Sequence, residues 1–373
     1  MHVGLNLIFL TPGESGGMET YARELLAELA ARGDLRVTAF VNRAAAAAGG
    51  PWTEHADQVL VDVDVANRVH WVRGEQMLLP GLARRAGVDV LHSLASTAPL
   101  RGGVPRVTTI HDLLYAKVPD AHFGLRGLGM RVLVPAAARR SDRVIVDAAS
   151  TRDDLVGDLG VAADKVDVVP LAADTGVPAE PEDEAAVRAG LGLGDRPVVL
   201  SVSAKRPHKN LPSLIRALAA IPAGRRPVLV IPGYPTPHEQ ELWELAAEVG
   251  VAGDLRMPGW VGPGELEGLY ALALACVLPS FYEGFGLPVL EAMRRGVPVA
   301  CSNRSSLPEV AGDAALTFDP GDQPAVTAAL TRLLDDGALR ERLRSAGREQ
   351  SARFSWRATA EATAGSYRRA LAR

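Results

Sequence analysis

The segment Ser280–Gly296 constrains the fold more than any other part of this sequence. An apolar run, Ala271–Pro279, reads as a strand and leads into a turn containing Gly284 and Gly286, after which a helix begins with Pro288 in its first turn. Glycine lets the backbone bend sharply and leaves its N–H groups uncovered, and proline suits a first helical turn because its missing N–H would have no partner there. Since uncovered amides at a helix N-terminus attract anions, the segment predicts a strand–turn–helix unit that binds a diphosphate.

Two acids flank the predicted anion site. Glu283 lies in the turn, and Glu291 lies one turn into the helix. Because carboxylates repel phosphate, we expect both acids to accept hydrogen bonds from sugar hydroxyls, and a ribose diol and a hexose both fit. The alternative is an ordinary strand–turn–helix whose acids are solvated.

Length, charge and cysteine content bound the class of protein. With 373 residues, 47% hydrophobic and 23% charged, the chain reads as a soluble protein of two domains. Its net charge of −4 provides no basic field for nucleic acid. Cys276 and Cys301 lie in apolar runs, which indicates free thiols in a reducing cytoplasm. We expect no signal peptide at the N-terminus, and the longest apolar run, near Leu269–Pro279, is too short to span a bilayer.

The first half begins like a doubly wound sheet. A predicted strand, His2–Leu10, is followed by a glycine turn at Gly17 and an amphipathic helix, Met18–Ala31. No G-x-G-x-x-G motif is present, which disfavours a dinucleotide site. The acidic, proline-bearing run Pro178–Glu184 is the best candidate boundary, so we expect domains over residues 1–175 and 196–352, a linker over 176–195 and a terminal helical segment over 353–373.

Polar residues at predicted strand ends supply further candidates. The strand Arg106–His111 ends in a histidine, and ligands of parallel sheets bind at the carboxyl ends of strands. His111 is therefore placed to donate a hydrogen bond to a sugar hydroxyl or a phosphate, and pairing with Asp112 is the alternative. Asp62 and Asp64 have the D-x-D spacing of a metal site, but simple strand alternation explains it, so we expect no metal.

A basic turn opens the second half. The predicted strand Pro197–Val202 runs into Ser203–Asn210, which contains Lys205, Arg206 and Lys209. These cations suit the charge that builds on a departing diphosphate. A solvated basic turn is the alternative.

The stretch Gly124–Arg143 mixes arginines with apolar residues, a combination that suits an anionic lipid surface or an anionic acceptor. Gly127, Gly129 and Pro135 are expected to interrupt any long helix there. We favour a solvated face, with weak contact to a membrane surface as the alternative.

Ser280–Gly296 is similar to the E-x7-E signature of retaining glycosyltransferases of family four. The continuations over residues 302–310 and 312–315 are similar to the same family's C-terminal domain, and a weaker resemblance extends over the whole chain. The resemblance implies the α/β GT-B fold, with two Rossmann-like doubly wound domains facing a central cleft. It also implies a C-terminal helix that crosses back to the N-terminal, acceptor-binding domain.

The resemblance implies roles for individual residues. Gly17 would face the donor phosphates or the acceptor, with a tight turn free of ligand as the alternative. Lys209 matches the family's diphosphate lysine, and the partner arginine is replaced by Ala204, so its role would pass to Lys205 or Arg206 or be absent. The other implied contacts with the donor comprise His111 and Glu283 on the transferred sugar, Glu291 on the ribose, the Val261 backbone on the base, and the helix N-terminus at Phe285, Gly286 and Leu287 on the diphosphate.

These residues predict a retaining glycosyltransferase that uses a nucleoside-diphosphate sugar, either GDP-mannose or a UDP-sugar, without metal or other cofactor. The resemblance implies a front-face route to a hydroxyl of a saccharide, a lipid-linked sugar or a natural product. The Ser305–Val310 variant resembles mannosyltransferase-like members, which favours GDP-mannose. The alternatives are a GT-B-like sugar-nucleotide epimerase, which would need further acids, and a non-catalytic sugar-nucleotide-binding protein.

Overall fold

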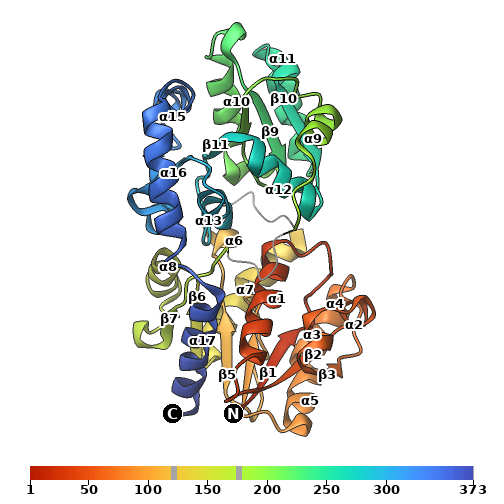
Figure 1. Ribbon diagram of the computed structural model, residues 1–373. Helices are drawn as coiled ribbons and strands as arrows, with labels where there is room; N and C mark the ends of the chain where they lie inside the picture. The colour runs from red at the N-terminus through yellow and green to blue at the C-terminus, as the bar shows by residue number, and fades with distance from the viewer. Residues whose placement is uncertain (119–123, 174–178, 373) are drawn as a thin grey trace. The chain divides into compact units, whose positions relative to one another are not determined.

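The computed structural model describes residues 1–118, 124–173 and 179–372. The chain divides into two compact units, and each contains its own sheet (Figure 1). Among the described residues, unit 1 comprises 1–116, 124–173 and 354–372, and unit 2 comprises 117–118 and 179–353.

Unit 1 is built on a seven-stranded parallel sheet in the order β3-β2-β1-β4-β5-β6-β7. Its strands are β1 (His2–Leu7), β2 (Arg36–Val41), β3 (Asp57–Leu60), β4 (Val90–Ser93), β5 (Arg106–Thr109), β6 (Arg143–Val146) and β7 (Val166–Val168). After β1 the chain adds β2 and β3 on one side and then returns to add β4 on the other. The strand order therefore reverses between β1 and β4, where open α/β sheets bind ligands.

Helices connect these strands, as the apolar periodicity predicts. They are α1 (Gly17–Ala30), α2 (Arg43–Ala48), α3 (Pro51–Glu54), α4 (Arg68–Arg73), α5 (Leu79–Ala86), α6 (Leu114–Lys117), α7 (Gly124–Arg140) and α8 (Ala149–Leu159). The C-terminal helix, α17 (Trp356–Leu371), packs against α1 and lies next to β4, β5 and β6 (Figure 1). The terminal helix thus returns to unit 1, as the resemblance implied.

Unit 2 contains a six-stranded parallel sheet in the order β10-β9-β8-β11-β12-β13. Its strands are β8 (Val198–Leu200), β9 (Val228–Pro232), β10 (Leu255–Gly259), β11 (Ala273–Leu278), β12 (Val299–Ser302) and β13 (Ala315–Phe318). Its helices are α9 (Glu184–Leu191), α10 (Leu211–Ala219), α11 (His238–Glu248), α12 (Pro263–Leu272), α13 (Leu287–Arg294), α14 (Leu307–Ala311), α15 (Gln323–Asp335) and α16 (Gly337–Ser351). Here the order reverses between β8 and β11.

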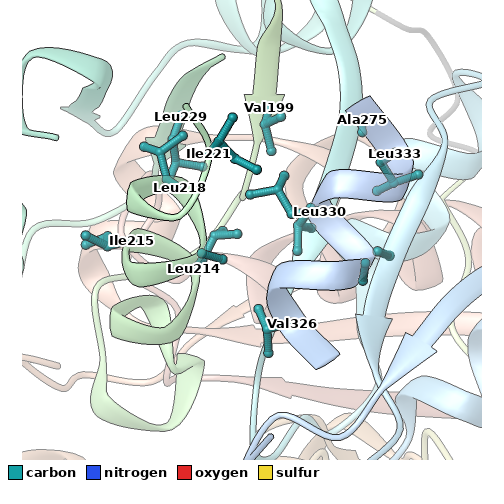
Figure 2. Packing of buried hydrophobic residues seen from close by; sticks show 14 of the residues in the cluster. Val199, Leu214, Ile215, Leu218, Ile221, Leu229, Ala275, Val326, Leu330 and Leu333 are labelled. Carbon is teal, nitrogen blue, oxygen red and sulfur yellow. The ribbon is translucent and has the colours of Figure 1, made fainter. Parts of the chain in front are cut away.

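A continuous apolar cluster holds one face of this second sheet. Figure 2 shows Leu214 and Leu218 of α10 and Leu330 of α15 around Val199 of β8, and all four side chains are buried. These helices therefore bury their apolar stripes against the sheet, which keeps the carboxyl ends of its strands in fixed register.

Several local predictions were wrong. α7 is one continuous helix with Pro135 inside it, because burial of Val134, Ala137 and Ala138 outweighs the hydrogen bond that proline cannot make. The threonine before the run Arg152–Leu159 predicts an N-cap at Thr151, but α8 begins at Ala149, so Thr151 lies inside the helix and does not cap it. No helix in the described ranges is both long and apolar enough to cross a membrane.

Two other segments differ from their predicted limits or secondary structure. The alternating run Gln58–Val65, which contains Asp62 and Asp64, predicts a strand of that length. The observed strand β3 ends at Leu60, because the Val63 N–H bonds the Val61 carbonyl and turns the chain. The stretch expected to be a linker, 176–195, contains α9, whose Val187 is buried in contact with the α12 glycine Gly268.

Candidate functional site

The carboxyl edge of the unit 2 sheet brings the two predicted turns together. The basic turn follows β8 and the glycine turn follows β11, and these strands are neighbours at the reversal of strand order. Residues separated by more than seventy positions therefore meet at the place where such sheets bind ligands.

Lys209 and Glu283 form the centre of this edge. Lys209 Nζ donates to both carboxylate oxygens of Glu283, at 2.7 and 2.8 Å, and Ser280 Oγ donates to Oε1 at 2.7 Å. The two charged side chains are only 19% and 11% exposed. Burial alone would raise the pKa of Glu283, but Lys209 and Ser280 outweigh it and hold that pKa below its usual value. Glu283 is therefore an ionised acceptor at neutral pH.

Two serines brace the turn from the loop that follows β12. Ser305 Oγ donates to the Glu283 carbonyl at 2.6 Å, and Ser306 Oγ lies 3.0 Å from that carbonyl and 2.7 Å from the Phe285 carbonyl. Ser305 has a positive φ of 56°, an unusual conformation for a residue other than glycine. In the sequence these serines stand out only as part of the run 302–310, and their contact with the turn depends on β11 and β12 being neighbours.

The helix after the turn begins where the sequence predicts. Gly286 precedes α13 with a φ of 108°, and a Cβ at this position would lie 2.6 Å from Leu307 Cδ2, so only glycine fits. Phe285 is buried beside it, and Leu287 is the first helical residue. Within the described residues no side chain caps α13, so the positive end of the helix dipole is available to an anion.

Glu291 lies on α13 and is fixed by a tyrosine that sequence reasoning missed. Tyr270 OH donates to Glu291 Oε2 at 2.9 Å. Burial raises the pKa of Glu291, although Tyr270 and Arg295 oppose the shift. Arg295 lies over the Tyr270 ring at 4.6 Å and forms an ion pair with Glu267. Oε1 of Glu291 has no hydrogen-bond partner within the described part of the chain, so it is the oxygen that can accept from a ligand.

Lys205 and Arg206, the two candidates for the diphosphate contact that Ala204 cannot make, lie in different environments. Lys205 is fully buried, and its Nζ donates to the Gly233 carbonyl at 2.6 Å. Burial lowers its pKa to about 8. Arg206 is half-buried, and its guanidinium has no hydrogen bond or ion pair to any described residue. Lys205 thus fastens the turn to β9, whereas Arg206 is free to meet a ligand.

Val261 follows β10 at the same edge and is 7% exposed. Its neighbour Trp260 is 57% exposed and stacks on Tyr234, with ring centroids 4.5 Å apart. The predicted base-contacting backbone therefore lies beside a flat aromatic surface.

In unit 1, His111 follows β5 and is held by two acceptors. Its Nδ1 lies 2.7 Å from Asp147 Oδ2, and its Nε2 lies 2.8 Å from the Leu94 carbonyl. Nε2 donates to the Leu94 carbonyl, and an ionised Asp147 accepts from Nδ1, so this pair of contacts favours the protonated ring. Burial alone would lower the pKa of His111, but Asp147 and the Leu94 carbonyl raise it overall. The pairing with Asp112 considered from sequence is wrong, since Asp112 accepts from the Leu114 N–H at 2.9 Å.

A buried polar chain runs beside His111. Tyr21 of α1 packs edge-on against the His111 ring, with centroids 5.0 Å apart, and its OH lies 2.9 Å from Thr109 Oγ1. His92 bridges Thr109 Oγ1 and Tyr367 OH, each at 2.8 Å. Burial lowers the pKa of His92 to about 3, so it stays neutral. The chain connects α17 to the strands that carry His111.

The remaining candidates lie elsewhere in unit 1. Gly17 is the exposed first residue of α1, after Gly16. Asp62 pairs with Arg43, and Asp64 accepts from the Ala66 N–H, so each carboxylate has a local partner.

Asp147 was missed although the sequence held a signal for it. It directly follows β6, which is the neighbour of the strand before His111, and carboxyl ends of neighbouring parallel strands meet at one edge. No comparable local signal pointed to Tyr270, which contacts Glu291 from α12, or to Tyr21, which contacts His111 from α1.

Comparison with known proteins agrees with this architecture. A family model described as "Glycosyl transferases group 1" matches residues 183–350, and one described as "Glycosyltransferase Family 4" matches residues 15–177. The chain is 33% identical to O-antigen chain mannosyltransferase B of Escherichia coli over 70% of each chain. It is 31% identical to the D-inositol 3-phosphate glycosyltransferase of Acidothermus cellulolyticus, over 96% of this chain and 87% of that one.

Solved structures show the same fold. Sucrose-phosphate synthase from Thermosynechococcus elongatus superposes with a TM-score of 0.78 at 23% identity, over 100% of this chain and 99% of that one. The Anabaena protein HepE, solved with UDP and glucose, gives a TM-score of 0.78 at 19% identity over 98% of each chain. Two parallel α/β units, matches to both family models and relatives that are glycosyltransferases together show that this chain has the GT-B fold and belongs to glycosyltransferase family 4.

Proposed function

We propose that this glycosyltransferase moves a sugar from a nucleoside-diphosphate donor to a hydroxyl acceptor with retention of configuration and without a metal. The observation that carries the proposal is the buried Lys209–Glu283 pair at the N-terminal end of α13, where a cation, a carboxylate and a helix dipole lie at one sheet edge. This combination matches a ligand with a diphosphate and a hydroxyl-rich sugar.

Departure of the diphosphate is the step at which the enzyme must stabilise the most developing charge. The bond between the sugar C1 and the β-phosphate oxygen breaks, and negative charge builds on that oxygen. Lys209, Arg206 and the N-terminus of α13 stabilise this charge electrostatically. The acceptor oxygen then bonds to C1 on the same face, and its proton passes to the departing phosphate oxygen. No side-chain nucleophile is required.

The carboxylates and His111 position the donor. Glu283 is ionised and accepts from hydroxyls of the transferred sugar, while Oε1 of Glu291 accepts from the ribose diol. Both ring nitrogens of His111 are bonded to Asp147 and Leu94, so the protonated ring orients the sugar or a phosphate oxygen through its positive charge and not through a hydrogen bond. The Val261 backbone contacts the base.

The relatives support a choice of donor and acceptor class. One is named an O-antigen chain mannosyltransferase and another an MMP alpha-(1->4)-mannosyltransferase, so we favour GDP-mannose as donor and a saccharide as acceptor. The HepE structures contain UDP or UDP-glucose, which keeps a UDP-sugar as the competing donor. Cys276 and Cys301 are free and buried, which fits a reducing cytoplasm.

Thermal shift with UDP, GDP, dTDP, ADP and NAD, each with and without magnesium, tests the donor assignment. A ligand at about a hundred times its Kd stabilises a protein by about 2.7 kcal/mol, which is easily measured. Stabilisation by GDP without magnesium supports the proposal. Stabilisation by NAD alone, or only in the presence of magnesium, contradicts it.

Two variants test the residue roles. Glu291→Ala should weaken nucleotide binding, whereas the exposed α11 variant Glu244→Ala should not. Lys209→Ala should lower kcat about tenfold or more, because it removes one group that stabilises the leaving charge. Donor turnover that depends on added acceptor separates a transferase from an epimerase and from a binding protein.

A further inference from the structure

A buried carboxylate in unit 1 is used by none of the steps above. Glu75 lies in a single π-helical turn, Gly74–Leu78, between α4 and α5, and it is 1% exposed. π turns inserted between α-helices are frequent at functional sites. A Cβ on Gly74 would lie 2.2 Å from Val63 Cγ1, so the turn is pressed closely onto the segment that follows β3.

The partners of Glu75 come from the strand ends where the order reverses. Its Oε1 accepts from Thr97 Oγ1 at 2.8 Å and from Asn6 Nδ2 at 3.3 Å, and its Oε2 accepts from Gln76 Nε2 at 3.0 Å. Asn6 Nδ2 also lies 3.2 Å from Ser93 Oγ, the last residue of β4. All these partners are neutral, and no cation pairs with Glu75 anywhere in the described ranges. Burial accordingly raises its pKa to about 7.

Thr97 connects Glu75 to a strained turn. The Thr97 N–H bonds the Ala95 carbonyl at 2.8 Å across Ser96, which has a positive φ of 63°. Such three-residue turns are uncommon for a residue other than glycine and persist only when their surroundings hold them. Here Gln76 adds two further restraints, since its side chain bonds the Ala98 carbonyl at 3.0 Å and the Leu100 N–H at 2.9 Å.

The loop formed by residues 94–100 also contacts His111. The Leu94 carbonyl, one residue before this turn, accepts from His111 Nε2 at 2.8 Å, and the Ser96 N–H bonds the Thr109 carbonyl at 2.9 Å. The loop 94–100 is therefore clamped between Glu75 and Gln76 on one side and the residues that follow β5 on the other.

We propose that Glu75 is a positioning residue for glycosyl transfer, which through Thr97 and the Ser96 turn fixes the Leu94 carbonyl and thereby the imidazole of His111. The inference rests on the transferase role of His111 proposed above. It assigns a function to the π turn, which holds the loop at the reversal point of the unit 1 sheet in one conformation.

Histidine titration by NMR tests the proposal without any ligand, with the His111 resonance assigned from a His111→Gln variant. In Glu75→Ala and in Thr97→Val we expect a lower pKa of His111, because its Nε2–H loses the fixed carbonyl that favours the protonated ring. Glu75→Gln and Thr97→Ser keep the oxygen and hydroxyl that bond each other, so both should restore the wild-type titration. The exposed α3 variant Glu54→Ala is the matched control.

Kinetics supply the second readout, with GDP-mannose and methyl α-mannoside as probes. We expect kcat to fall about tenfold in Glu75→Ala and Thr97→Val, as for a misplaced catalytic group. GDP affinity should stay unchanged, because the groups proposed to hold the base and the ribose, Val261 and Glu291, lie in unit 2. An unchanged His111 titration in both variants overturns the inference, even if they are less stable, because Glu75 is then merely structural. If the wild-type protein transfers no sugar from any donor, the proposed function fails, whereas the titration still decides whether Glu75 fixes His111. Where Glu75→Ala does not fold, Thr97→Val carries the test alone.

Discussion

The buried carboxyl of Glu75 should make the stability of this protein depend on pH in a predictable direction. Burial raises its pKa from the usual 4.5 to about 7, so the folded state prefers the neutral acid. The contribution of the neutral Glu75 carboxyl to the free energy of unfolding is fully present below about pH 4.5 and is lost as the pH rises through about 7. At about 1.4 kcal/mol for each pKa unit, the full loss is about 3.5 kcal/mol.

Glu75→Gln removes the titration and keeps the size of the side chain. The free energy of unfolding of the variant, minus that of the wild type, should therefore rise by about 2.5 kcal/mol between pH 5 and pH 8. Any constant cost of the new amide beside Gln76 shifts this difference at every pH and leaves its slope unaffected. Urea denaturation at a series of pH values measures the slope.

Glu54→Gln provides the control, because that side chain is 65% exposed on α3. Its difference curve should be flat. A flat curve for Glu75→Gln as well would refute the reasoning, because it would mean that the three neutral donors solvate the buried carboxylate as well as water does.

Two further perturbations concern unit 2. Lys209→Met leaves Glu283 buried without its cation and should destabilise the protein by about 3 kcal/mol, while the double variant with Glu283→Gln recovers most of that loss. Equal denaturation midpoints for wild type and Lys209→Met would contradict this. Gly286→Ala should cost about 1–3 kcal/mol from its φ of 108°, with a further loss from displacing Leu307, and it should weaken nucleotide binding. A melting temperature and a GDP affinity equal to those of the wild type would show that the turn relaxes freely.

Local patterns in the sequence were sufficient for the architecture and for part of the site. Apolar runs followed by glycine turns and amphipathic helices predicted two doubly wound units, and the helix N-terminus after Gly286 was placed to within a residue. These features are set by neighbouring residues, because a positive φ needs glycine and a strand needs a run of apolar side chains. The position of His111 at a strand end followed from the same kind of information.

Only the tertiary structure decided which side chains pair. Asp112 is adjacent to His111 in sequence, yet Asp147 holds the ring, because β6 lies next to β5 in the sheet. Lys205 and Arg206 are equivalent candidates in the sequence, but Lys205 is buried and bonded to the Gly233 carbonyl, whereas Arg206 is only half-buried.

Glu75 is the clearest example of a residue whose environment depends on the tertiary structure alone. Nothing near it in the sequence indicates a buried acid, because its partners Asn6 and Thr97 lie 69 and 22 residues away. They meet it only because β1 and β4 are neighbours and a π turn directs Glu75 to their ends. Strand order and side-chain burial arise from the packing of distant segments, and a reading of local periodicity contains no information about them.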